Sequence, residues 1–223
     1  HAFDFAKLAG GAILVRLARQ GESIQTLDGL THKLSTQMLV IADAKQAVAV
    51  AGVMGGQASG VTDATTTLLL ESAQFDPVTV RRTARALGLS SESSYRFERG
   101  VDPMGVEAAS ARASALIQQL AGGREVAKRD VGSRPGARAA IVVEPQRLSR
   151  WLGLRVQSPE LRGTLVRLGC RVASSGASAL MHVIPPSFRQ DLSQPVDLYE
   201  EVARLIGYDR LPATIPSGPL GRP

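Results

Sequence analysis

The stretch 71–103 reads ESAQFDPVTVRRTARALGLSSESSYRFERGVDP, and it decides how the first half of the chain folds. Asp76 is a favoured N-cap residue, and Pro77 follows it at the first helical position, where proline is common. Gly88 is the residue type that most often ends a helix. The pattern therefore predicts a helix over 77–87. The carboxylate of Glu71 lies before this helix, and two serines, Ser91 and Ser93, and an arginine-rich turn lie after it. Such a combination is typical of part of a binding or catalytic site.

The same capping signal occurs again where the stretch ends. Asp102 precedes Pro103, and Gly122 with Gly123 ends an apolar periodicity, which predicts a second helix between them. Short strands are predicted before residue 71, with a hairpin-type turn signal at Asp28-Gly29. Their expected ranges are 12–16, 23–26, 39–42, 46–53 and 65–70.

Several glycines end or follow the strand expected over 46–53. Gly52, Gly55, Gly56 and Gly60 let the backbone bend sharply or let another group approach closely. A glycine-rich loop fits either ordinary turns or a cradle for a ligand, because the pattern has low specificity. Both interpretations stay open at this point.

The best linker candidate is the segment Gly132-Ser133-Arg134-Pro135-Gly136, because glycine and proline continue neither helical nor strand periodicity. It predicts two domains, over 1–133 and 134–223. In the second domain, a Ser174-Ser175-Gly176 turn is expected to join two strands. The strands are expected over 139–143, 170–173 and 179–184, and two helices over 145–152 and 195–206. A further helix is expected to be opened by Ser158-Pro159 and closed by Gly169. The chain as a whole is therefore predicted to be α+β.

The composition favours a folded chain with an anionic partner. Of the 223 residues 44% are hydrophobic, and the net charge is +6. Lysine and arginine make a nucleic acid a reasonable partner, although 4% aromatic residues leave little material for base stacking. The one cysteine, Cys170, is expected to be a buried structural thiol in a reducing cytoplasm. No apolar run approaches the roughly 20 residues that span a bilayer, and no signal peptide is visible, so a soluble, cytoplasmic fragment is expected.

Four motifs spread over the chain point to one family. They are His-Ala-Phe-Asp at 1–4, Gly-Val-Met-Gly-Gly at 52–56, Leu-Leu-Glu ending at Glu71, and Glu-Glu-Val-Ala-Arg-Leu-Ile-Gly-Tyr at 200–208. Together they resemble the β subunit of bacterial phenylalanyl-tRNA synthetase. The resemblance implies a mixed sheet-and-helix editing domain, part of which would precede the first residue. A small winged-helix-like domain with a short β-ribbon would follow it.

The resemblance also implies an editing pocket for the tyrosine of mischarged Tyr-tRNA. Its positions are His1, Gly55, Glu71, Ser91 and Ser93. Ser91 and Ser93 stand where the family often carries Thr and Ala, and Glu71 would accept a hydrogen bond from the tyrosine hydroxyl. No protein nucleophile is apparent, so hydrolysis by a positioned water is expected. The alternative is that Glu71 acts as a cap or forms a salt bridge, for example with Arg96 or Arg99, and that the serines only cap a turn.

Four carboxylates near the end of the chain form a second candidate site. They are Asp191, Asp197, Glu200 and Glu201. On a helix the last three fall at i, i+3 and i+4 and project on one side, and hard oxygen ligands suit Mg²⁺. The resemblance implies a Mg²⁺ shared with the catalytic α subunit. The alternative is local pairing with Arg204, which lies four residues after Glu200.

Arginines near the first candidate site have two possible roles. Arg81, Arg82 and Arg85 fit either a contact with tRNA or an ordinary solvated helix face. Arg99, beside the turn at Gly100, is expected to be structural because a guanidinium commonly satisfies carbonyls and carboxylates there.

The resemblance implies that the chain is part of phenylalanine–tRNA ligase. It would hydrolyse mischarged Tyr-tRNA and support the α subunit of a heterotetramer that uses ATP to charge the tRNA for phenylalanine. ATP would be used by the full enzyme and not bound by this chain, and no membrane partner is expected. A non-catalytic scaffold or tRNA-binding module, and a stand-alone aminoacyl-tRNA deacylase, remain alternatives.

Overall fold

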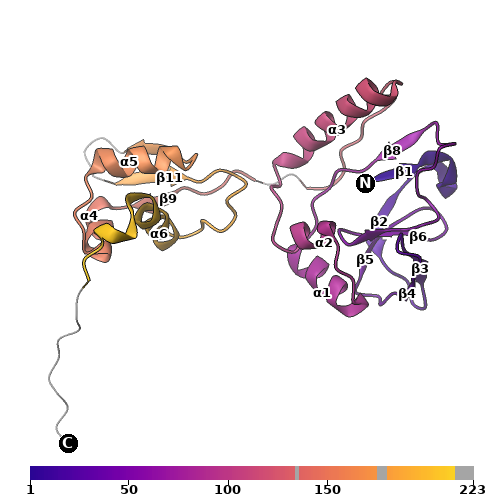
Figure 1. The fold of residues 1–223 in the computed structure, drawn as a ribbon, viewed down its shortest axis with the longest axis horizontal. Helices are drawn as coiled ribbons and strands as arrows, with labels where there is room; N and C mark the ends of the chain where they lie inside the picture. The colour runs from indigo at the N-terminus through magenta and orange to yellow at the C-terminus, as the bar shows by residue number, and fades with distance from the viewer. Residues whose placement is uncertain (134–135, 175–179, 214–223) are drawn as a thin grey trace, which may run out of the picture. The chain divides into compact units, whose positions relative to one another are not determined.

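The computed structural model describes residues 1–133, 136–174 and 180–213, and the chain divides into two compact units. Unit 1 is His1–Arg134 and unit 2 is Pro135–Pro223 (Figure 1). Both units combine helices with antiparallel strands, so the predicted α+β class is confirmed. Arg134 and Pro135 of the expected linker, and Ser175-Gly176 of the expected turn, lie outside the described residues.

Unit 1 is built around a four-stranded antiparallel sheet with the order β2-β5-β6-β7. Two further strand pairs, β1–β8 and β3–β4, stand beside it. The strands are β1 (Ala2–Asp4), β2 (Leu14–Leu17), β3 (Ser23–Gln25), β4 (Thr31–Lys33), β5 (Leu39–Ala42), β6 (Ala47–Val50), β7 (Met54–Gly55) and β8 (Leu68–Leu70). Two short 3₁₀ helices, η1 (Phe5–Lys7) and η2 (Ala9–Gly11), follow β1.

The hairpin signal at Asp28-Gly29 closes the β3–β4 pair. The Asp28 carboxylate accepts a hydrogen bond from the Leu30 N–H at 3.1 Å, and Gly29 has a φ of 83°. The partner strand β4 was not anticipated, because its residues Thr31–Lys33 are mostly polar and do not alternate. The strand expected over 39–42 pairs instead with β2 and β6.

The core of unit 1 lies between the central strands and helix α1 (Pro77–Leu87). All four residues of β6 are buried, and Val80 of α1 is 1% exposed. The Asp76 carboxylate accepts a hydrogen bond from the Thr79 N–H at 2.7 Å, and Gly88 ends the helix in the left-handed conformation. The predicted helix over 77–87 is therefore confirmed, and its caps act as the sequence indicated.

Helices α2 (Glu92–Phe97) and α3 (Gly105–Ala121) complete unit 1, and α1 packs beside α2 (Figure 1). The sequence reasoning missed α2, which is short and is capped by Ser91 rather than by an acidic residue. The expected start of the second helix at Pro103 is wrong. Asp102 accepts a hydrogen bond from the Met104 N–H and so stabilises a turn before the helix, which begins at Gly105.

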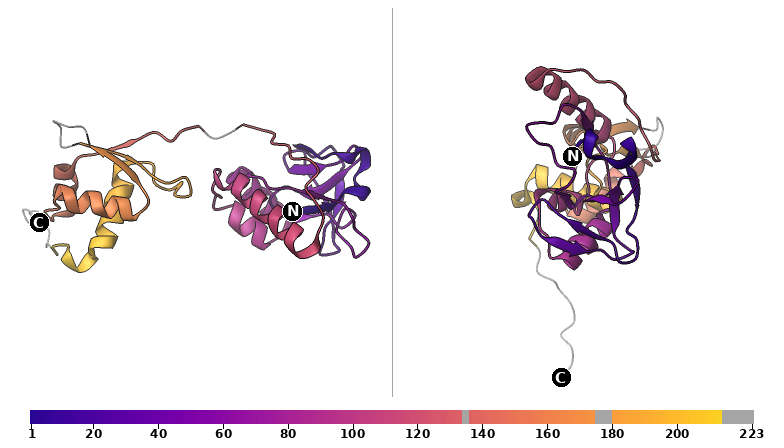
Figure 2. Two further views of the ribbon diagram at one scale, coloured as in Figure 1. Left: turned by 90° about the horizontal axis from the view of Figure 1, so that it is seen from above. Right: turned by 90° about the vertical axis from the view of Figure 1, so that its right-hand side faces the viewer.

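Unit 2 has a three-stranded antiparallel sheet, with the order β10-β11-β9, and helices that pack against it (Figure 2). Its elements are β9 (Ile141–Val143), α4 (Pro145–Leu152), α5 (Ser158–Arg167), β10 (Arg171–Ser174), β11 (Met181–Ile184), α6 (Pro195–Ile206) and the 3₁₀ helix η3 (Tyr208–Arg210). The helices expected over 145–152 and 195–206 are confirmed. α5 begins at Ser158 and ends at Arg167, and Gly169, with a φ of 81°, closes it as expected.

Two further expectations concern the interior and the membrane. Cys170 is buried among the apolar residues of unit 2, and this burial raises the pKa of its thiol. The described part of the chain contains no helix that is long and apolar enough to cross a membrane.

Candidate functional site

The loop around β7 brings together the residues that the sequence placed in the first candidate site. A Cβ atom on Gly55 would lie 2.3 Å from Cε1 of His1, so the imidazole occupies the space that a side chain would need. A Cβ on Gly56 would lie 2.5 Å from the backbone oxygen of Val48. The lack of a side chain at Gly55 therefore leaves room for a neighbouring group, here the His1 ring. The lack of a side chain at Gly56 is needed for close packing against the Val48 backbone.

His1 and Glu71 extend the β1–β8 ladder by one residue pair. Ala2 faces Leu70 in the antiparallel register, and the next pair outward exchanges two backbone hydrogen bonds. The His1 amino group donates to the Glu71 carbonyl at 2.8 Å, and the Glu71 N–H donates to the His1 carbonyl at 2.7 Å. Opposite residues of an antiparallel pair project on the same face. Glu71, His1 and Gly55 therefore lie together.

Glu71 is half-buried, and burial raises the pKa of its carboxyl, while the positive amino group of His1 acts in the opposite direction. The alternative that Glu71 pairs with an arginine is wrong. Arg96 pairs with Glu92 at 3.1 Å, and Arg99 pairs with Glu98 at 2.6 Å. Within the described ranges no lysine or arginine forms an ion pair with Glu71. This carboxyl is therefore available as an acceptor for a ligand.

Both serines are directed at the loop that leads into β7. Ser91 Oγ donates to the Val53 carbonyl at 2.5 Å, and Ser93 Oγ donates to the Gly52 carbonyl at 3.1 Å. Ser91 also caps α2, because its Oγ accepts a hydrogen bond from the Ser94 N–H at 3.0 Å. Their hydroxyl protons are thus used by the protein, which leaves lone pairs to accept from a ligand. The role of these serines in a pocket stays a prediction.

Two hollows in the described residues lie outside these five positions. One, of about 260 Å³, lies between the end of α1 and α2 and is lined by residues that include Arg85 and Tyr95. The other, of about 510 Å³, lies in unit 2 between α5 and the end of α6. The sequence reasoning did not single out Tyr95, although an aromatic residue within an arginine-rich segment was a visible signal.

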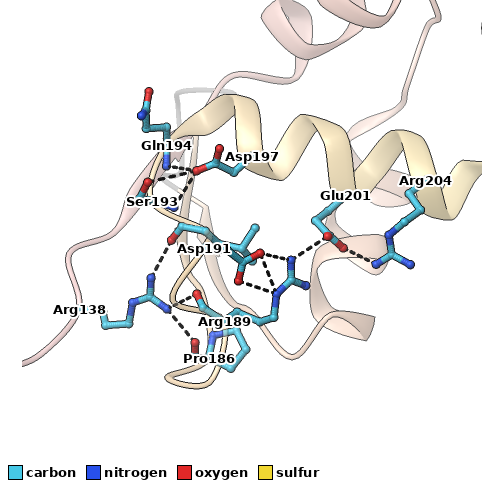
Figure 3. A network of polar contacts seen from close by, with 10 residues as sticks. Arg138, Pro186, Arg189, Asp191, Ser193, Gln194, Asp197, Glu201 and Arg204 are labelled. Atoms are coloured by element: carbon cyan, nitrogen blue, oxygen red, sulfur yellow. Dashed lines mark hydrogen bonds and ion pairs between the residues drawn. The ribbon is translucent and has the colours of Figure 1, made fainter. Parts of the chain in front are cut away.

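The second candidate site has a different arrangement from the one expected, as Figure 3 shows. The Arg189 guanidinium binds both Asp191, at 2.6 Å, and Glu201, at 2.7 Å. Glu201 also pairs with Arg204. The Asp197 carboxylate accepts hydrogen bonds from the N–H groups of Ser193 and Gln194 at 2.8 and 2.7 Å and caps α6, while Glu200 is exposed.

These partners change the charges on which a metal site would depend. The hydrogen bond from Arg189 lowers the pKa of both Asp191 and Glu201, and the backbone N–H of Ser193 lowers that of Asp197. No group of three or more histidine, cysteine or acidic side chains gathers around a possible metal position in the described ranges. The four residues as they stand here do not fit Mg²⁺, because a guanidinium lies where the cation would be needed.

Arg138 fixes the loop that carries Arg189 and Asp191. It donates to the carbonyl oxygens of Pro186 and Arg189, both at 2.8 Å, and to that of Leu192 at 2.7 Å (Figure 3). Three charge-assisted bonds from one side chain hold this loop in place.

The arginines of unit 1 fall into two groups. Arg99 donates to the Tyr95 carbonyl and pairs with Glu98, so its expected structural role agrees with its contacts. Arg81, Arg82 and Arg85 are exposed on α1. Contact of these three residues with tRNA stays a prediction.

Two protein-family models match this chain and define the class of protein to which it belongs. Residues 1–122 match the family model of the B3/4 domain, and residues 141–208 match that of the tRNA synthetase B5 domain. The chain therefore belongs to the B3/4 domain family.

The chain is also similar to β subunits of phenylalanine–tRNA ligase. The chain is 45% identical over 218 residues to that subunit of Rhodopirellula baltica, covering 97% of this chain and 32% of the relative. It is 48% identical over 218 residues to that of Moorella thermoacetica, covering 97% and 27%. The resemblance read from the motifs is thus confirmed, and the chain spans about a third or less of the length of these relatives. A crystal structure of an N-terminal fragment of the phenylalanyl-tRNA synthetase β-subunit from Pyrococcus horikoshii is similar at a TM-score of 0.46 and 18% identity, covering 94% of this chain and 59% of that one.

Proposed function

We propose that unit 1 is the editing domain of a phenylalanine–tRNA ligase β subunit and that it hydrolyses mischarged Tyr-tRNA. Unit 2 is then the small winged-helix-like domain that follows it. The observation that carries the proposal is the convergence of His1, Gly55 and Glu71 at one end of the β1–β8 ladder. The half-buried carboxyl of Glu71 has no arginine or lysine partner among the described residues.

The physical reason for such a site is the difference between tyrosine and phenylalanine. A pocket that binds phenylalanine through apolar contacts cannot strongly reject a ring that only adds a hydroxyl. A second site with a hydrogen-bond acceptor selects that hydroxyl. One charge-assisted bond of about 1.5–3 kcal/mol separates the two amino acids by roughly 10- to 150-fold.

The chemistry assigned to these residues is binding and orientation. Glu71 holds the tyrosine hydroxyl, and Gly55 lets the substrate approach the backbone beside His1. The serines fix the loop at Gly52 and Val53 through their hydrogen bonds. Hydrolysis then uses a water held against the ester, since no side chain near Glu71 combines a nucleophile with an adjacent base in the described part of unit 1.

The remaining roles belong to the whole enzyme. The α subunit of a heterotetramer performs the ATP-dependent charging of the tRNA for phenylalanine, and this chain supports it. Mg²⁺ and ATP serve that reaction in the cytoplasm, and ATP is not a ligand of this chain. Arg81, Arg82 and Arg85 form an exposed basic face on α1 that suits contact with tRNA.

The test is a pair of substitutions at Glu71 in the complete enzyme. Glu71→Ala removes the acceptor, so hydrolysis of Tyr-tRNA should fall by about one to two orders of magnitude, while charging with phenylalanine stays near normal. Glu71→Gln keeps an acceptor without the charge and should be intermediate. Release of labelled tyrosine from Tyr-tRNA measures the effect.

The electrostatics of Glu71 provide a control for folding. Because burial raises the pKa of this carboxyl, its ionised form does not stabilise the fold, and neither variant should lower stability at neutral pH. Normal editing by two folded variants would contradict the proposed site and favour the scaffold alternative. Deacylation by the isolated chain at the full enzyme's rate would favour the stand-alone deacylase, whereas we expect weak or undetectable activity.

A further inference from the structure

The hollow between α1 and α2 adjoins the candidate site and has no function assigned to it so far. It has a volume of about 260 Å³. Its lining includes Arg85 from α1 and Leu89 just after it, with Ser94 and Tyr95 from α2 and Glu98 at the end of that helix. Ser94 links it to the candidate site, because Ser94 and Ser91 cap each other while Ser91 binds the Val53 carbonyl. The hollow and the loop before β7 therefore share the start of α2.

The ring of Tyr95 is the feature that suggests a ligand. It is 55% exposed, and the guanidinium carbon of Arg99 lies 3.6 Å from its centroid. Arg99 is itself fixed, because it donates to the Tyr95 carbonyl at 2.8 Å and to the Glu98 carboxylate at 2.6 Å. One face of the ring is thus held by a cation, and the charge of Glu98 is compensated. A rigid, exposed aromatic ring is a surface on which a planar group stacks.

The charge at the edge of the hollow suggests the second part of the ligand. Arg85 is exposed, and its guanidinium forms neither a hydrogen bond nor an ion pair with any described residue. Arg81, one helical turn earlier on the same face, is exposed and unpaired in the same sense. A cation that lines the same hollow as an aromatic ring, with a second cation one helical turn away, matches an anionic group joined to a planar one.

We infer that this hollow binds one nucleotide of single-stranded RNA, with the base on Tyr95 and the neighbouring phosphate at Arg85. The inference rests on the proposed function, which supplies the RNA as the single-stranded acceptor end of tRNA. The volume of the hollow, about 260 Å³, suits a single base. Pockets that enclose larger, drug-sized ligands have volumes of roughly 300–1,000 Å³. Tyr95 and Arg85 are then binding residues that place the acceptor end beside the loop that leads into β7.

The test measures binding of a short, fluorescently labelled single-stranded RNA ending in CCA to the 223-residue chain. Tyr95→Ala should weaken binding by about 5- to 150-fold, the loss expected for one stacked base, while Tyr95→Phe should retain most of it. Arg85→Gln should reduce the slope of log K against log salt concentration by about 0.7. Arg112→Gln, an equal charge change at an exposed and unpaired position of α3, is the matched control and should change little.

Two results would overturn the inference. One is unchanged binding by Tyr95→Ala in a chain that melts at the normal temperature. The other is an equal loss for Arg85→Gln and Arg112→Gln, which would indicate diffuse attraction to a basic surface. Because the probe carries no amino acid, the assay is independent of hydrolysis. RNA binding that does not depend on Tyr95, together with editing that depends on Glu71, would contradict this inference alone. RNA binding that depends on Tyr95, without editing that depends on Glu71, would contradict the proposed function alone.

Discussion

Glu22 offers the sharpest test of what stabilises unit 1. Its carboxylate accepts two hydrogen bonds from the Arg16 guanidinium, at 2.8 and 2.7 Å. It also accepts from the N–H groups of Arg19, at 2.7 Å, and Ala47, at 2.9 Å. One side chain thus joins the turn after β2 to the first residue of β6. These bonds, with that from Arg16 the largest contribution, lower the pKa of Glu22 from 4.5 to about 2.

The magnitude follows from that difference. A shift of one pKa unit corresponds to about 1.4 kcal/mol, so Glu22 stabilises the folded state by roughly 3 kcal/mol at pH 7. Because the folded pKa is the lower one, this stability is fully present above pH 4.5 and is lost as the pH falls toward about 2. At pH 3 roughly 1.5 kcal/mol should remain.

Glu22→Gln keeps the shape but cannot accept from both Arg16 nitrogens. We expect it to lower the free energy of unfolding by about 2–3 kcal/mol at pH 7, and by about half as much at pH 3. Urea unfolding followed by circular dichroism measures both values. Glu107→Gln is the control, because its pair with Lys128 is exposed on both sides and should contribute less than about 1 kcal/mol. A loss at pH 7 no larger than that of the control, or one that does not shrink at pH 3, would refute the reasoning.

Three further outcomes are expected. Gly55→Ala should reduce editing more than stability, because its Cβ meets the movable His1 ring, whereas Gly56→Ala meets the Val48 backbone and should cost about 1–3 kcal/mol in urea unfolding. Arg138→Met should destabilise unit 2 by about 1–3 kcal/mol, because three partly buried carbonyl oxygens lose their donor; retention of the wild-type unfolding midpoint would contradict this. Calorimetric titration of the isolated chain with Mg²⁺ should show little binding, and one tight site would show that the arginine pairs open for a metal.

Local signals predicted what is decided locally. The helix over 77–87 has its N-cap, its first-turn proline and its terminal glycine within the segment itself, so the sequence was sufficient. Helix α2 was not predicted, because it has six residues and because its cap is a reciprocal pair of serines. Strand β4 was not predicted, because a polar strand beside a hairpin turn has no alternation of apolar and polar residues.

The acidic residues of unit 2 show why a ligand set is harder to predict. Helical spacing correctly placed Asp197, Glu200 and Glu201 on one helix. The partner that matters, Arg189, lies on the preceding loop, and only the folded chain brings it between Asp191 and Glu201. The local alternative identified the right arginine, Arg204, but its acidic partner is Glu201 rather than Glu200.

A comparison of the carboxyl groups of unit 1 explains why Glu71 stands apart. Burial works to raise the pKa of Asp43, yet the N–H groups of Gln46, Ala9 and Lys45 outweigh it, and the pKa is lowered. Glu22 reaches the same result through Arg16. Among the carboxyls of the described residues whose pKa moves clearly, Glu71 is the one that moves upward, because burial there has only the His1 amino group against it. The proposed role of Glu71 agrees with this difference, because a carboxyl without a donor from the fold can accept a hydrogen bond from a ligand, and a phenolic hydroxyl is such a donor.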